Sequence, residues 1–99
     1  STFSWITTNT NYTASTNDHI FVDTSSGTVT ISLPATPSIG DNITFIDYAG
    51  TCGLNPLVFD RNGNLIMGLA EDLVVDVYNA SNTLVYSGAA YGWKIGAVL

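Results

Sequence analysis

The fold class is decided by residues 23–34, which read DTSSGTVTISLP. From Thr28 onward, hydroxyl and apolar side chains alternate. Val29, Ile31 and Leu33 therefore share one face of a strand, and the hydroxyl groups share the other. A Ser-Gly turn precedes this run, and Pro34 ends it because proline cannot donate to a sheet ladder. The stretch predicts a half-buried β-strand bounded by turns.

The same pattern recurs along the chain. Short runs rich in Val, Ile, Thr, Tyr and Phe are separated by clusters of Gly, Asn, Pro or Ser, about every 8 to 12 residues, which is typical of a sandwich or barrel. Asn62-Gly63 favours the positive φ angles of a tight hairpin turn. We predict a small antiparallel β-sandwich or barrel-like domain. Its strands are expected at 3–8, 19–23, 28–33, 42–48, 57–60, 64–67, 73–78, 83–86 and 92–95.

Several predicted strands are apolar on both faces. The chain is 45% hydrophobic and only 10% charged, whereas about 25% charged residues is usual for a soluble domain. An antiparallel sheet commonly leaves one face in water, so a second apolar face indicates a second packing partner. We expect copies of the chain to supply it, with Ile46, Val58 and Val74 at the oligomer interface.

The charge balance excludes some partners. The chain contains eight acidic residues and two basic ones, Arg61 and Lys94, which give it a net charge of −6. Nucleic-acid binding draws much of its affinity from phosphate neutralisation by Lys and Arg, so no nucleic-acid partner is expected. A neutral glycan meets no electrostatic obstacle. No run reaches the roughly 18 apolar residues of a membrane span, so membrane insertion is not expected either.

The residues that could carry catalysis are few. His19 is the only histidine and Cys52 the only cysteine, and no positive neighbour in the sequence would activate the thiol. The acidic residues Asp47, Asp60, Glu71, Asp72 and Asp76 are interpreted as solvated turn carboxylates rather than as a hydrolase pair. Asp60-x-Asn62-x-Asn64 has the oxygen spacing of a calcium loop but lacks its bidentate glutamate. We predict no catalytic residue, no metal and no cofactor.

Aromatic residues are the stronger signal for binding. An aromatic ring can stack on the C–H face of a sugar while nearby amides and hydroxyls bond its oxygens. Tyr12, Tyr48, Tyr91 and Trp93 are the candidate ligand-binding residues. Trp93 occupies one of the alternating positions of the predicted strand at 92–95. For this residue, packing in the core or between subunits is the competing interpretation.

The first residues differ from the rest. Residues 1–16 are rich in Thr, Asn and Ser and contain no charged side chain. We expect a polar extended lead-in at 1–16, which pairs at a sheet edge or joins the domain to a preceding shaft. A single all-β domain at 17–99 follows, as part of a longer protein.

Three motifs resemble sequences of bacteriophage tail-fibre and tailspike proteins. They are residues 23–34 followed by Pro-Ser-Ile-Gly-Asp at 37–41, then IMGLAEDL at 66–73, and the ending LVY at 84–86 with GWKI at 92–95. The resemblance spans roughly residues 12–95. It implies a homotrimeric β-structured module of a virion appendage, made in the bacterial cytoplasm, with Gly27, Pro34, Gly40 and Asp41 as turn-formers. The His-x-His iron repeat and the polysaccharide-cleaving groove of some relatives are missing from this sequence.

These observations lead to one main hypothesis and two alternatives. The first is a non-catalytic host-attachment module located in the virion, with itself, other virion proteins, and a host surface glycan or protein as partners. The alternatives are a carbohydrate-binding, lectin-like module of a larger enzyme, and a pure trimerisation or spacer domain without a ligand.

Overall fold

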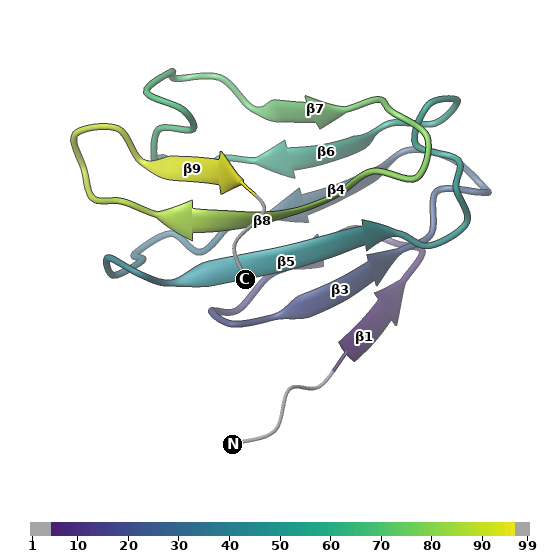
Figure 1. Cartoon of the computed structure of the whole chain (residues 1–99), viewed down its shortest axis with the longest axis horizontal. Helices are drawn as coiled ribbons and strands as arrows, with labels where there is room; N and C mark the ends of the chain where they lie inside the picture. The colour runs from purple at the N-terminus through teal and green to yellow at the C-terminus, as the bar shows by residue number, and fades with distance from the viewer. Residues whose placement is uncertain (1–4, 97–99) are drawn as a thin grey trace.

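A computed structural model describes residues 5–96, which form two packed β-sheets (Figure 1). The five-stranded sheet has the order β1 (Trp5–Thr8), β3 (His19–Val22), β5 (Asn42–Asp47), β8 (Ser81–Tyr86) and β9 (Trp93–Gly96). The four-stranded sheet has the order β2 (Tyr12–Thr13), β4 (Val29–Ser32), β6 (Leu57–Asp60) and β7 (Leu73–Val75). The all-β prediction is confirmed for these residues, and no helix occurs among them.

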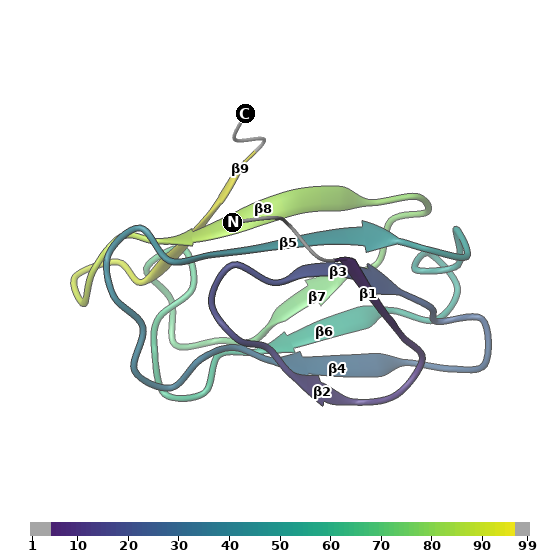
Figure 2. The same cartoon turned by 90° about the horizontal axis from the view of Figure 1, so that it is seen from below.

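From β1 to β6 each strand lies in the other sheet from the strand before it, as the view from below shows (Figure 2). β1, β3 and β5 are therefore parallel to one another, and so are β2, β4 and β6. The antiparallel pairs are β5 with β8, β6 with β7, and β8 with β9. The prediction of an antiparallel sandwich is wrong: both sheets are mixed, and they do not close into a barrel.

The physical reason lies in the connections. The turn at Thr24–Gly27, closed by a 3.2 Å bond from the Gly27 N–H to the Thr24 carbonyl, carries the chain across the sandwich from β3 to β4 instead of back along the same sheet. Gly27 adopts a φ of 146°. A Ser-Ser-Gly sequence suits such an arch as well as it suits a hairpin, because both need glycine's freedom at positive φ.

A second correction concerns residues 61–72. Asn62 and Gly63 do form a tight turn, with φ angles of 49° and 89°. The turn does not join two paired strands, because β6 pairs with β7, which begins only at Leu73. The predicted strand at 64–67 is wrong: Ile66 makes only isolated bridges, to Leu69 and to Trp93.

The core lies between the two sheets. Alternation along each strand directs every second side chain inward, as the buried and half-buried positions of β3, β4, β5 and β6 show. Phe45 and Phe59 join the layers, with ring centroids 5.1 Å apart. Burial of one such side chain stabilises a fold by about 1.5–3 kcal/mol. The fully buried apolar side chains include Ile20, Val22, Ile31, Leu33, Ile43, Leu57, Phe59, Leu84 and Trp93.

The described part of the polar lead-in belongs to both sheets. β1 pairs with β3 in parallel register, Trp5 opposite His19, and β2 pairs with β4, Tyr12 opposite Ile31. These two strands are the edges of the sheets on one side of the molecule (Figure 2). Residues 5–13 therefore form the first turn of the winding that β3 to β6 continue.

Candidate functional site

An exposed row of aromatic rings crosses the outer face of the five-stranded sheet. Trp5 of β1 stacks on Phe21 of β3, with ring centroids 4.5 Å apart and planes inclined by 28°. Phe21 in turn meets Tyr48, which follows the last residue of β5, edge to face at 5.8 Å. Trp5 is 42% exposed and Tyr48 is 58% exposed. We call Trp5, Phe21 and Tyr48 the aromatic row.

Parallel pairing produces the row. In this parallel register Trp5 is opposite His19 and Phe21 is opposite Ile46, so each ring of the row lies two residues further along than the partner of the ring before it. Ile20 and Val22 point inward and are fully buried, so His19 and Phe21 point outward. His19 lies beside Trp5, with centroids 5.1 Å apart.

Hydroxyl groups line the sheet face next to the row. Thr44 of β5 and Thr83 of β8 are directly opposite each other, and their hydroxyl oxygens are 3.0 Å apart. Ile46, half-buried, follows on the same face of β5. An array of ring faces and edges beside hydroxyl groups can stack on the apolar face of a sugar and bond its hydroxyls.

The four sequence-predicted binding residues do not converge. Tyr48 belongs to the aromatic row. Tyr91 is 64% exposed but lies in the loop that follows β8, which runs antiparallel to β5, so it lies at the opposite end of the sandwich. Tyr12 is half-buried, and its hydroxyl donates to Asp18 Oδ2 at 2.8 Å. Burial and this bond raise the pKa of Tyr12.

Trp93 requires a correction. Its side chain has no exposed surface, and its ring packs edge to face on Tyr86 at 5.4 Å. A ligand cannot reach it, so the competing interpretation of Trp93 as a core residue agrees with the structure. The cause is Gly92: its N–H bonds to Gly88 and its α-carbon lies against the Leu65 carbonyl, which carries the next residue inward.

The three predicted interface residues lie on two different faces. Val58 and Val74 are direct partners on the outer face of the four-stranded sheet, where Val74 is 53% exposed. Ile46 lies on the outer face of the five-stranded sheet, on the other side of the core. The structure therefore does not bring Ile46 together with the two valines.

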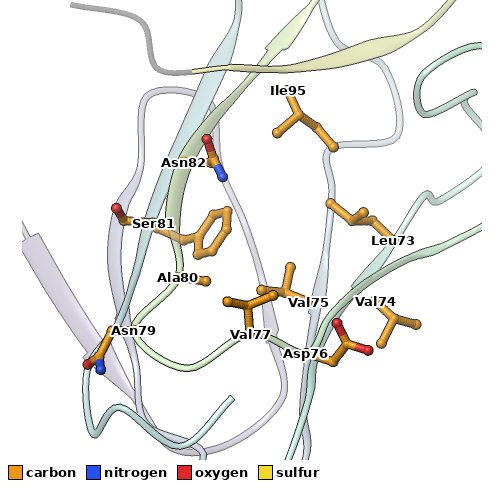
Figure 3. Close-up of a pocket in the computed structure, with 11 residues that line it drawn as sticks. Leu73, Val74, Val75, Asp76, Val77, Asn79, Ala80, Ser81, Asn82 and Ile95 are labelled. Atoms are coloured by element: carbon orange, nitrogen blue, oxygen red, sulfur yellow. The ribbon is translucent and has the colours of Figure 1, made fainter. Parts of the chain in front are cut away.

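A groove of about 460 Å³ opens at the edge of the sandwich, between β7 and the pair β8 and β9. In Figure 3 Leu73, Val75 and Ile95 point toward one another across it, while Val74 and Asp76 point away. Its walls are mostly the inner, apolar sides of the two sheets. The groove is therefore an open margin of the core, and its volume is in the range of small-molecule pockets.

A carboxylate that sequence analysis placed in solvent is buried. Asp47 is only 3% exposed, at the end of β5. Its Oδ1 accepts from the Thr51 N–H at 3.1 Å, and its Oδ2 accepts from the N–H groups of Cys52 and Asn79, each at 2.9 Å. Burial by itself would raise the pKa of Asp47, but the three donors together hold it below its ordinary value. The interpretation of Asp47 as a solvated turn carboxylate is wrong, because Asp47 fastens two loops.

The other candidate groups also have structural partners. Cys52 is buried next to Thr24, and burial raises the pKa of its thiol to about 11, so the thiol stays protonated at neutral pH. The Asn62 amide donates to the Leu33 carbonyl at 2.9 Å, and the Asn64 amide donates to the Ala35 carbonyl at 3.1 Å. The two asparagines of the calcium-like sequence therefore join the loop after β6 to the loop after β4, and they do so as hydrogen-bond donors.

Within residues 5–96 no group of three or more His, Cys, Asp or Glu side chains is arranged to hold a metal ion. The same residues contain no helix of the length and apolarity that crossing a membrane requires.

Sequence reasoning found Tyr48 but missed its neighbours Trp5 and Phe21. The available signal was the alternation of His19-Ile20-Phe21-Val22, which places Phe21 on the face opposite to two aliphatic residues. That signal becomes a site only when β1, β3 and β5 are known to be parallel neighbours.

In comparisons with known proteins, no protein-family model matches this chain and no curated protein matches it.

Proposed function

We propose that this chain is a non-catalytic host-attachment module of a bacteriophage tail fibre or related virion appendage, that it acts as a homotrimer, and that the aromatic row binds a neutral glycan on the host surface. The observation that carries the proposal is the exposed row itself. Exposed, mutually packed aromatic rings on a rigid sheet are costly to keep in water and are enriched where proteins bind.

The net charge of the chain limits the class of glycan that it can bind. At a net charge of −6, the domain repels anionic polysaccharides and leaves neutral ones unaffected. One shallow row gives weak binding, because few rings contact each sugar. Three copies held together raise the apparent affinity by about 10² or more without any new contact. Trimerisation therefore complements a weak site.

The carboxylates support a non-catalytic role. A glycosidase needs two carboxyl groups facing the scissile bond across a gap of about 5–10 Å. Asp47 is buried under three backbone donors, the Asp60 carboxylate accepts from the Asn62 N–H, and the Asp72 carboxylate accepts from the Arg61 N–H. These groups hold turns.

The same aromatic row also suits a carbohydrate-binding module of a larger enzyme. The solution mass separates the two proposals, because such a module works as a monomer whereas the attachment module requires three chains.

The test is a glycan array probed with the purified chain displayed multivalently. We expect binding to neutral glycans, a loss of at least tenfold in the variants Tyr48→Ala and Trp5→Ala, and little binding to anionic glycans. Tyr78→Ala is the matched control, because Tyr78 is 59% exposed and Tyr48 is 58% exposed, yet Tyr78 lies outside the row. A blank array under multivalent display, or equal losses in the variants and the control, would contradict the proposal.

A further inference from the structure

The loop between β6 and β7 carries a strained apolar turn at Ile66–Leu69. Two backbone bonds close it, from the Ile66 N–H to the Leu69 carbonyl at 3.0 Å and from the Leu69 N–H to the Ile66 carbonyl at 2.9 Å. Its central residues, Met67 and Gly68, have φ angles of 52° and 78°. A left-handed conformation costs a residue such as methionine about 1–2 kcal/mol, and glycine or asparagine adopts it more easily. The sequence thus keeps a methionine where an asparagine would stabilise the fold.

Two further backbone bonds join the turn to the end of the loop between β8 and β9 and to the first residue of β9. The Met67 N–H donates to the Trp93 carbonyl at 2.7 Å, and the Gly68 N–H donates to the Tyr91 carbonyl at 2.8 Å. Met67 is nevertheless 46% exposed, Leu69 55% and Tyr91 64%. Because the backbone of the turn is already ordered, a partner that covers these side chains does not have to order the loop as well. This arrangement suits a binding surface.

Charged side chains of opposite sign come from the two different sheets beside these apolar side chains. Lys94 is in β9 of the five-stranded sheet, and its ammonium lies 5.9 Å from the centre of the Tyr91 ring. Glu71 and Asp72 immediately precede β7 of the four-stranded sheet and line a hollow of about 130 Å³ together with Met67 and Leu69. We call the surface formed by Met67, Leu69, Tyr91, Lys94, Glu71 and Asp72 the Met67 patch. Lys94 is one of only two basic residues in the chain.

We propose that the Met67 patch is the contact between copies of this chain, arranged head to tail. The apolar centre is covered by the next copy, and Lys94 of one copy faces Glu71 of a second copy. Such a contact joins two different parts of the surface on neighbouring copies. Repeated from copy to copy, it forms a closed ring when the rotation between neighbours divides a full turn. The proposal rests on the homotrimer of the proposed function and names the surface that forms it.

The outer sheet faces are less suited to a closed ring. Ile46 and the pair Val58 and Val74 lie on opposite outer faces of the sandwich. Contact between opposite faces stacks copies in a line and leaves the ends open. The Met67 patch avoids this because its oppositely charged side chains lie at one end of the molecule.

The first test uses Met67→Asn, with Leu54→Asn as the matched control, since Leu54 is 70% exposed in the loop between β5 and β6 at the opposite end. Analytical ultracentrifugation over a dilution series measures the association constant, with urea unfolding at each concentration because the stability of an assembly depends on chain concentration. We expect Met67→Asn to weaken association at least tenfold and to raise the stability of the dissociated chain. Leu54→Asn should change association by less than twofold.

A charge exchange provides the second test. Lys94→Glu and Glu71→Lys should each weaken association, because each places like charges face to face, and the double variant should recover most of the loss. A surface that binds a different protein would not show this recovery in self-association.

The outcomes separate the proposals. Unchanged association in Met67→Asn, an equal loss in Leu54→Asn, or no recovery in the charge exchange overturns the Met67 patch as the contact while a trimer and glycan binding stand. A wild-type chain that stays monomeric at every concentration overturns the contact and the trimer together. Glycan binding through the aromatic row is measured independently, on the array.

Discussion

The two ends of the sandwich are fastened by different chemistry. At one end, called here the Asp47 end, a single carboxylate accepts from the backbone of Thr51, Cys52 and Asn79 and so joins the loop after β5 to the loop after β7. At the other, the Met67 end, backbone groups bond directly to one another, as from the Trp93 N–H to the Leu65 carbonyl at 2.9 Å. The first end should therefore respond to charge and pH, and the second to added volume.

The largest effect is expected from Gly92→Ala at the Met67 end. A Cβ at Gly92 would overlap the backbone carbonyl of Leu65, and the residue has a φ of 73°. Backbone atoms cannot move aside as a flexible side chain can, so we expect a loss of more than about 3 kcal/mol in the free energy of unfolding. Urea denaturation measures it.

Gly63→Ala is the matched control for this variant. Gly63 has a φ of 89°, but a Cβ there would meet nothing within 4 Å. We expect only the cost of left-handed backbone, about 1–2 kcal/mol. Equal losses in the two variants would show that close approach does not fasten the Met67 end.

Asp47→Asn is expected to have the next largest effect, at the Asp47 end. The amide keeps one acceptor oxygen and turns an NH₂ group toward backbone donors, leaving buried groups unpaired. We expect a loss of about 2–4 kcal/mol in the free energy of unfolding. Asp76→Asn, an exposed carboxylate in the connection after β7, should change it by less than about 0.5 kcal/mol.

The pH dependence of stability sharpens the same comparison. The folded-state pKa of Asp47 lies below its ordinary value of 3.8, so the unfolded chain binds the proton more readily than the folded one. The stabilisation is complete above the ordinary pKa and is lost as the pH falls through the lowered one. We expect the stability difference between wild type and Asp47→Asn to be constant near neutral pH and to shrink below about pH 4. A difference that does not vary with pH would contradict ionisation as the source.

Apart from the control variants, the smallest effect on stability is expected next to Asp47 in the sequence. Tyr48 follows it but points outward, and its side chain is 58% exposed. Tyr48→Ala should change the free energy of unfolding by at most about 1 kcal/mol, the loss of one exposed ring contact, while glycan binding is lost. A large loss of stability would mean that the aromatic row supports the fold rather than a ligand.

The sequence predicted which side chains point inward far better than which strands pair. Val29, Ile31 and Leu33 are buried as expected, because alternation is a local property of one strand. Parallel pairing was not predictable, since the turn residues at 24–27 serve an arch and a hairpin equally well. The aromatic row depends on that pairing, so only Tyr48 was found. Asp47 was misassigned because its burial depends on how the loop at Thr51 and Cys52 folds back on it and on Asn79, which is 32 residues further along the chain.

The central claim is that this chain has more apolar surface than one copy can bury and shares it with others. Of the described residues, Leu69 and Tyr91 in the Met67 patch, Val74 in β7 and Val77 after it are each more than half exposed. The direct test is the solution mass of the purified wild-type chain by sedimentation equilibrium. We predict the mass of three 10.5 kDa chains. A stable, folded species of one chain at every concentration would contradict the claim.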